Sequence, residues 1–220
     1  MLLDFDLVDV FTDRPFAGNQ LAVVHGAEGL SSDQCLAIAR EFNFSETTFP
    51  AAVTGIGEYS VRIFTPGGEL PLAGHPLVGT AWLMRERGSP PAMLRPPAGQ
   101  VPVRFDGELT WVTARPEWSP PWQFEPARSA AEIDSMPADG EGRVETGVWA
   151  WLDEEAGIAR ARVFVNASGI VEDEATGSAA LMPCTQLGRE IEIRQGAGSV
   201  IWARPLEGGL AEIGGCVAFD

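Results

Sequence analysis

ELPLAGHPLVGTAW, residues Glu69–Trp82, places one of the chain's only two histidines, His75, between a glycine and a proline. Proline is favoured in the first helical position, where its missing N–H costs nothing, so we expect Pro76 to occupy that position. The apolar run that follows predicts a helix over His75–Gly88. His75 would then stand at the mouth of that helix, where unpaired backbone N–H groups attract anions.

A similar pattern recurs in the second half of the chain. RIFTPGGELPLAGHPLVGTAW (Arg62–Trp82) can be aligned with RVFVNASGIVEDEATGSAAL (Arg162–Leu181). Each segment begins Arg-aliphatic-Phe, passes through an acidic loop, reaches a glycine and enters an apolar helix, the second predicted over Ser178–Gly188. Identity between the segments is slight, so chance is an alternative to an internal repeat. A true repeat predicts two similar lobes whose helix N-termini together bind a small carboxylate or phosphate; the alternative is two capped core helices.

The other patterns are typical of an α+β protein with strands and few helices. SSDQCLAIAREFN predicts a helix, with Ser31 and Gln34 forming a capping box. PPAMLRPPAGQ is proline-rich and lacks periodicity, which indicates a linker. We therefore expect an N-terminal lobe over residues 1–99 and a C-terminal lobe over 100–220, with a strand near 206–220 able to return to the first lobe.

Composition excludes several classes of function. The net charge of −16 argues against nucleic acid as a partner. The chain has no lysine, which removes Schiff-base chemistry and a pyridoxal phosphate lysine, and its two histidines and three scattered cysteines suggest neither zinc nor disulfides. The longest stretch without Asp, Glu, Lys or Arg, Leu70–Met84, is too short to span a membrane. We expect a cytoplasmic protein without cofactor or metal.

Three ionisable residues are candidates for catalysis, and each has an ordinary alternative. Glu46, in FNFSETTF, could be a solvated strand residue, and Asp173, in VEDEATGSAA, could belong to an acidic loop. His75 is singled out by its glycine and proline neighbours. Spacing alone does not join these three residues.

Four ordered segments resemble the signature segments of the phenazine-biosynthesis isomerase (PhzF-like) family: DVFTDRPFAGNQLAVV, FNFSETTF, IFTPGGELPLAGHPLVGTAW and GIVEDEATGSAA. QGAGSVIWARP and EIGGCVAF resemble that family's C-terminal strands, so the resemblance covers nearly the whole chain. It implies the diaminopimelate-epimerase-like fold, in which two pseudo-symmetric lobes each wrap a mostly antiparallel sheet around a central helix. The active site lies between the lobes, and family members are commonly homodimers.

The resemblance also implies roles for individual residues. Glu46 matches the catalytic acid/base, His75 the histidine of the GH motif and Asp173 the aspartate of the ED-x-ATGS motif. The substrate, largely through its carboxylate, is expected to be held at the helix mouths by Gly74, Gly177 and Ser178. Asn19 fits a GN-P motif near the cleft, although Gln20 replaces the usual proline.

The implied activity is isomerisation or epimerisation of a small carboxylate-bearing molecule. Glu46 would remove a proton and return it elsewhere, with no cofactor. Related epimerases of this fold use two cysteines, whose positions here fall at Ala73 and Ala175, so two-thiol racemisation is not expected. One alternative is a non-catalytic small-molecule binding protein on the same scaffold. Another is an interaction protein with an exposed tryptophan surface, although core or dimer packing better fits Trp111, Trp118, Trp122, Trp149 and Trp151.

Overall fold

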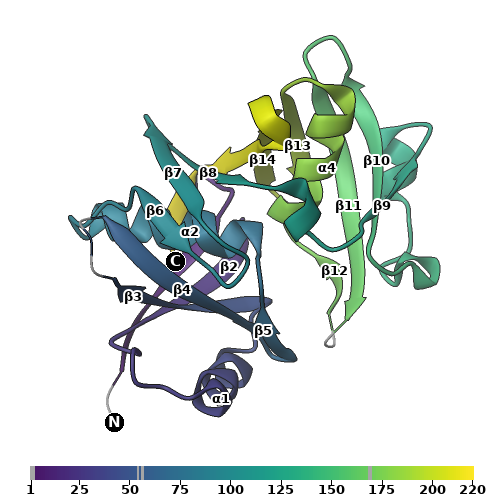
Figure 1. Ribbon diagram of the computed structural model, residues 1–220. Helices are drawn as coiled ribbons and strands as arrows, with labels where there is room; N and C mark the ends of the chain where they lie inside the picture. The colour runs from purple at the N-terminus through teal and green to yellow at the C-terminus, as the bar shows by residue number, and fades with distance from the viewer. Residues whose placement is uncertain (1–2, 54, 56, 168–169) are drawn as a thin grey trace.

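The computed structural model describes residues 3–53, 55, 57–167 and 170–220, and it has the predicted α+β class (Figure 1). The strands of the first half are β1 (Asp4–Val10), β2 (Asn19–His25), β3 (Glu46–Ala52), β4 (Glu58–Thr65), β5 (Gly68–Leu70), β6 (Met93–Arg95), β7 (Val101–Asp106) and β8 (Leu109–Ala114). Those of the second half are β9 (Gln123–Pro126), β10 (Thr146–Asp153), β11 (Ile158–Ala167), β12 (Ile170–Asp173), β13 (Ile191–Gln195), β14 (Ser199–Pro205), β15 (Ala211–Gly215) and β16 (Val217–Phe219). The helices are α1 (Ser32–Phe42), α2 (Gly74–Glu86), α3 (Ala130–Asp134) and α4 (Gly177–Leu187).

Strand pairing repeats along the chain. In the first half β2 and β3 are parallel and joined through α1, β3 pairs antiparallel with β4, β5 folds back on β4, and β4 is parallel to β6 across α2. In the second half β9 and β10 are parallel and joined through α3, β10 pairs antiparallel with β11, β12 folds back on β11, and β11 is parallel to β13 across α4. The two aligned sequence segments therefore correspond to equivalent units, β4–β5–α2 and β11–β12–α4.

The two sets of strands are joined into one mixed sheet. Neighbouring strands follow the order β16-β1-β2-β3-β4-β6-β7-β8-β15-β14-β13-β11-β10-β9. The last strand, β16, pairs antiparallel with β1, so the C-terminus lies against the N-terminal half of the fold (Figure 1). β8 pairs antiparallel with β15 and carries the sheet from one half to the other.

The proline-rich stretch is not a linker, so that prediction is wrong. Its centre forms β6, which pairs with β4 on one side and β7 on the other. The prolines of the stretch flank these three residues, where no ladder hydrogen bond is lost. Leu94 is fully buried. Burial of the Leu94 side chain therefore stabilises a short strand in a segment whose sequence shows no strand periodicity.

Helix α2 is buried over most of its length. All ten residues from Gly74 to Leu83 are buried, as expected for a helix that is apolar on every side. The helix begins one residue earlier than predicted, with Ala73 as N-cap, so Pro76 occupies the third helical position and not the first. The first three helical N–H groups all lack an i−4 carbonyl partner, so proline is tolerated there as well.

Two other helices follow their sequence signals. α1 begins with the predicted capping box, in which the Gln34 N–H donates to Ser31 Oγ and the Ser31 N–H donates to Gln34 Oε1. α4 begins at Gly177, one residue before the predicted start, and ends at Gly188 in the left-handed conformation. No helix among the described residues is long and apolar enough to cross a membrane.

Candidate active site

The N-terminal ends of α2 and α4 meet at two glycines. A Cβ atom on Gly74 would lie 2.9 Å from the Cα of Gly177 and 2.5 Å from Ile213 Cδ1. A Cβ atom on Gly177 would lie 3.2 Å from the Cα of Gly74. Neither glycine has the positive φ that would itself require glycine. These residues are therefore glycine because two helix starts approach each other closely, which brings two sets of first-turn N–H groups together.

A cavity of about 420 Å³ opens beside this meeting point. Glu46, Asp173 and Ser178 line it, whereas His75, Gly74 and Gly177 are not among its lining residues. The wall combines these polar groups with aromatic and aliphatic side chains, as small-molecule sites usually do. The remaining lining residues are Ser45, Thr65, Leu70, Pro71, Leu72, Ala73, Trp118, Ser119, Pro120, Trp122, Glu145, Val165, Ile170 and Thr176.

Glu46, which is largely buried and lines this cavity, forms a close pair with the fully buried His75. Glu46 is the first residue of β3, and its Oε2 lies 3.5 Å from Nδ1 of His75, the second residue of α2. The side chains are 14% and 3% exposed. Among the described residues, Glu46 Oε2 and His75 Nε2 have no hydrogen-bond partner. The two groups that sequence spacing could not join are thus in direct proximity.

Burial controls the charge of both groups. Desolvation, helped by the nearby charge of Asp173, raises the pKa of Glu46 to about 8, and a hydrogen bond from Ser45 acts in the opposite direction. Desolvation lowers the pKa of His75 to about 3, against a smaller opposing effect of a backbone hydrogen bond with Gln20. At neutral pH the pair is therefore a carboxylic acid beside a neutral imidazole. A carboxyl that ionises near neutral pH is suited to both accepting and returning a proton.

Asp173, at the end of β12, faces the same cavity from the second half of the chain. Its Oδ1 accepts a hydrogen bond from Asn19 Nδ2 at 2.8 Å, and its Oδ2 accepts one from Thr176 Oγ1 at 2.7 Å. Burial raises its pKa, whereas these hydrogen bonds favour the charged form. The hydrogen bonds from Asn19 and Thr176 favour the carboxylate form of Asp173, and the charge of that carboxylate is one of the causes that raise the pKa of Glu46.

Asn19 links the two carboxyl groups. Its Nδ2 donates to Asp173 Oδ1 and to the Ala175 carbonyl, at 2.8 and 3.0 Å, and its Oδ1 accepts from Ser45 Oγ at 2.9 Å. Ser45 directly precedes Glu46. The sequence motif placed Asn19 near the cleft, and the structure gives it three buried or half-buried hydrogen bonds that connect β2, β3 and the start of α4.

Sequence reasoning missed Gln195. This buried residue ends β13, and its Nε2 donates to the Asp173 carbonyl at 2.8 Å and to Thr176 Oγ1 at 3.1 Å. Its Oε1 accepts from the Thr176 N–H at 3.2 Å. The sequence does contain a signal for this residue. Ile191, Ile193 and Gln195 occupy every second position of the strand and face the core, so a side-chain amide on that face indicates a buried polar contact.

Two alternatives can be compared with the structure. No cysteine lines the cavity, and the nearest sequence equivalents of an epimerase's two thiols, Ala73 and Ala175, lie at or just before the starts of α2 and α4. Trp111, Trp118, Trp122, Trp149 and Trp151 are all buried or half-buried, so these five residues do not form an exposed tryptophan surface. Among the described residues, no group of three His, Cys, Asp or Glu residues has a metal-binding arrangement.

A family model described as phenazine biosynthesis-like protein matches residues 8–150. This chain belongs to that family. A trans-2,3-dihydro-3-hydroxyanthranilate isomerase of Pseudomonas aeruginosa is 31% identical over 235 residues, which cover 86% of this chain and 84% of that protein. An uncharacterized isomerase of Pasteurella multocida is 43% identical over 100 residues, or 44% of this chain and 35% of that protein. The chain is an isomerase of this family.

Solved structures share the fold. A phenazine biosynthesis protein of the PhzF family from Enterococcus faecalis superposes with a TM-score of 0.82 at 22% identity, covering 100% of this chain and 97% of that one. A hydroxyproline epimerase from Agrobacterium vitis, with bound trans-4-hydroxy-L-proline, has a TM-score of 0.60 at 13% identity, covering 99% and 91%. The expected likeness to the phenazine-biosynthesis and epimerase folds is therefore confirmed.

Proposed function

We propose that this isomerase moves a proton on a small carboxylate-bearing substrate without a cofactor, with Glu46 as the single acid/base. One observation carries the proposal: Glu46 is a buried carboxyl with a pKa of about 8 that lines a 420 Å³ cavity, 3.5 Å from a neutral His75. Catalytic carboxyl groups are commonly adjusted toward neutral pKa by burial of this kind.

The reaction begins when the ionised form of Glu46 removes a proton from a carbon next to the substrate's carboxylate or unsaturated system. The C–H bonding electrons move into that system and give it enolate-like character. The Glu46 carboxylic acid then returns the proton to a different carbon, or to the other face of the same carbon, which regenerates the Glu46 carboxylate. No electrons enter or leave, so the reaction needs no redox partner.

Two other ionisable residues support this transfer. His75 supports the proton transfer through its contact with Glu46. Its Nδ1 lies beside the Glu46 carboxyl, and its imidazole stays neutral through the working pH range. Asp173, fixed by Asn19 and Thr176, accepts a hydrogen bond from a polar group of the substrate on the other side of the cavity. The substrate's carboxylate is assigned to the helix starts at Gly74, Gly177 and Ser178, where backbone N–H groups stabilise negative charge as it develops.

The repeated strand pairing supports a description of the chain as two pseudo-symmetric lobes, residues 1–99 and 100–220, with the substrate between them. The family resemblance supports a homodimer, and the cytoplasm is the compartment expected from the sequence. Sedimentation velocity would test the dimer directly.

The experiment that tests this function is hydrogen exchange from heavy water, read by NMR. Wild type and Glu46→Gln are incubated with trans-2,3-dihydro-3-hydroxyanthranilate, the compound in the name of the Pseudomonas aeruginosa relative, and with a panel of amino and unsaturated carboxylic acids. We expect deuterium in at least one compound with wild type and none with Glu46→Gln.

The alternative function is a binding protein on the same scaffold. It would give ligand-induced shifts of protein signals with no deuterium in any compound. Label that enters at the same rate with both proteins would show proton transfer by a group other than Glu46. The presence of Glu46, His75 and Asp173 together favours the enzyme, because simple binding needs no carboxyl that is protonated at neutral pH.

A further inference from the structure

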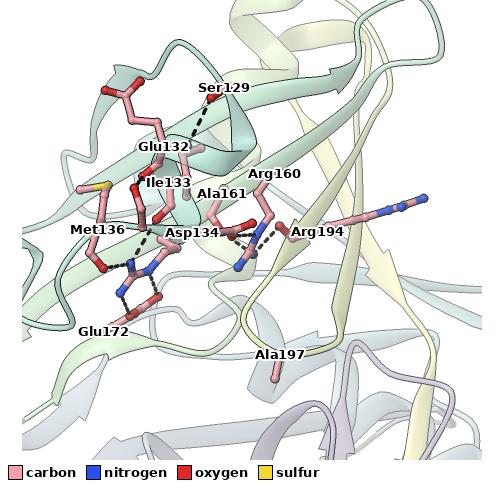
Figure 2. Close-up of polar contacts among 12 residues, drawn as sticks. Ser129, Glu132, Ile133, Asp134, Met136, Arg160, Ala161, Glu172, Arg194 and Ala197 are labelled. Atoms are coloured by element: carbon pink, nitrogen blue, oxygen red, sulfur yellow. Dashed lines mark hydrogen bonds and ion pairs between the residues drawn. The ribbon is translucent and has the colours of Figure 1, made fainter.

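The side chain of Arg162 is largely buried and forms hydrogen bonds with two separate elements of the fold. It lies on β11, its side chain is 10% exposed, and its guanidinium forms a bidentate pair with Glu172 of β12, Nε to Oε1 at 2.7 Å and Nη2 to Oε2 at 2.6 Å. The other N–H groups donate to three carbonyls that follow or end α3, those of Ile133, Met136 and Pro137. Figure 2 shows the hydrogen bonds at Glu172, Ile133 and Met136. All five donors of the guanidinium are used.

The pair fixes the strand that carries Asp173. In the β11–β12 ladder, Glu172 lies opposite Phe164 and Asp173 lies opposite Val163. Neighbouring residues of a strand point to opposite faces, so a Glu172 side chain held on one face directs Asp173 to the other, toward Asn19 and Thr176. A slip of one residue would reverse both side chains.

The backbone alone holds this strand weakly. β12 has four residues, pairs among the described residues with β11 alone, and its register is irregular between Phe164 and Ala167. Short strands with one partner have few ladder hydrogen bonds to define their register. Asn19, Thr176 and Gln195 hold Asp173 at the end of the strand, and the Arg162–Glu172 pair adds a second restraint one residue earlier that ties β12 to the end of α3.

The first half of the chain contains the same arrangement. Arg62 pairs with Glu69 of β5 through Nε to Oε1 and Nη2 to Oε2, both at 2.8 Å, and Glu69 lies opposite Phe64. The Arg62 guanidinium lies 4.9 Å from the centre of the Phe64 ring, and that of Arg162 lies 5.0 Å from the centre of the Phe164 ring. The Arg-aliphatic-Phe motif thus has the same structural use in both halves, and in each the strand it fixes leads to a central helix.

We propose that Arg162 is a positioning residue of the isomerase, acting through Glu172 to hold Asp173 in the catalytic cavity. This assignment rests on the proposed function only for its effect on turnover. Its geometric consequence, the placement of Asp173 relative to Glu46, can be measured without a substrate.

Arg162→Met is the variant that tests this, and Arg160→Met is the matched control. Arg160 also lies on β11 and also contacts the α3 region, through Asp134 at 2.9 Å, together with the carbonyls of Ala161 and Arg194 (Figure 2). Within the part of the chain that the structure describes, its side chain forms no hydrogen bond with β12. Loss of α3 anchoring alone would therefore affect both variants. A Glu172→Gln variant weakens the same pair with Arg162 retained, and it is read in the same way should Arg162→Met fail to fold.

The readout is the titration of Glu46, followed by NMR of ¹³C-labelled carboxyl groups. Glu46 faces the charge of Asp173 and the neutral ring of His75, with the Ser45 hydroxyl nearby. The charge of Asp173 raises the pKa of Glu46, so displacement of Asp173 should lower that pKa. We therefore expect Arg162→Met to move the Glu46 titration to a pH lower by about 1 unit. Arg160→Met should leave it in place, and in an Asp173→Asn background Arg162→Met should add no further change.

Turnover of trans-2,3-dihydro-3-hydroxyanthranilate gives the second readout. We expect Arg162→Met to lower kcat roughly 10-fold or more with KM changed less than about twofold, because the reacting geometry is affected more than binding. An unchanged Glu46 titration in a folded Arg162→Met, or equal shifts in both arginine variants, overturns the assignment. If the Glu46 titration differs between the variants as expected but the wild type turns over no compound of the panel, the positioning role stands and the proposed function is rejected.

Discussion

Glu46 Oε2 lies 3.5 Å from His75 Nδ1 in a site where both groups are buried and neither is charged at neutral pH. Each residue is supplied by a different element, the start of β3 and the first turn of α2. Burial makes it costly to deprotonate Glu46 or to protonate His75. These costs predict how the stability of the protein should depend on pH.

Glu46 should destabilise the protein at alkaline pH. Its pKa is about 8 in the folded state and about 4.5 in the unfolded chain, so between these values the folded state binds the additional proton. Stability from this group is therefore lost as pH rises from about 4.5 to 8. We expect Glu46→Gln to be more stable than wild type at pH 9 by about 1–3 kcal/mol, with a smaller difference at pH 6. Thermal unfolding at both pH values measures this, and Glu41→Gln, on the exposed side of α1, should show no such trend.

His75 should destabilise the protein at acidic pH. Its pKa is about 3 when folded and about 6.5 when unfolded, so the unfolded chain binds the additional proton between these values. Stability is therefore lost as pH falls below about 6.5. We expect His75→Gln to reduce this loss by roughly 2 kcal/mol at pH 4.5. His25→Gln, at the partly exposed contact with Asp6, is the control, and equal effects of the two variants would contradict the buried neutral state of His75.

The close approach of the two helices should make Gly74 sensitive to a single methyl group. Gly74→Ala would place Cβ 2.5 Å from Ile213 Cδ1 and 2.9 Å from the backbone of Gly177. We expect a loss of about 1–3 kcal/mol in the free energy of unfolding in urea, and a loss of activity because the helix starts separate. Gly68→Ala, in β5, meets nothing within 4 Å and should be nearly neutral. Equal stability of the two alanine variants would show that the helix starts are less tightly packed than described.

Asn19 should matter more for activity than its neighbours do. Asn19→Ala leaves one oxygen of Asp173 and the Ser45 hydroxyl without their buried partner. We expect the isomerisation rate to fall roughly 10- to 100-fold, corresponding to about 1–3 kcal/mol for lost hydrogen bonds to a buried charge. Gln20→Ala changes an exposed side chain at the next position and should retain near-normal activity. Comparable rates for the two variants would remove Asn19 from the site.

The sequence predicted the helices that build the site but not the reason for their glycines. The expected role of Gly74 and Gly177 was to hold the substrate, whereas in the structure they pack against each other behind the cavity wall. A glycine at a helix start is compatible both with a bound ligand and with close packing against another backbone. The sequence does not distinguish the two, because the neighbouring backbone is known only from the structure. Substrate contact by these residues stays a prediction.

Contacts between distant segments were the other part beyond sequence reasoning. Asn19 and Asp173 are separated by 154 positions, and Gln195 reaches Thr176 from another strand. Local patterns mark each residue as polar on an apolar face without identifying its partner. β6 shows the same limit, because the burial of Leu94 makes a strand in a stretch whose prolines indicated a linker.

The most direct test of a single Glu46 acid/base is the fate of the transferred hydrogen. Trans-2,3-dihydro-3-hydroxyanthranilate deuterated at the carbon that loses its proton is converted in ordinary water in a single turnover, and the product is read by mass spectrometry and NMR. A single buried carboxyl predicts that part of the deuterium reappears at the carbon that gains a proton, and that Glu46→Gln forms no product. Complete loss of deuterium to water in every turnover would contradict transfer by one carboxyl shielded in this cavity.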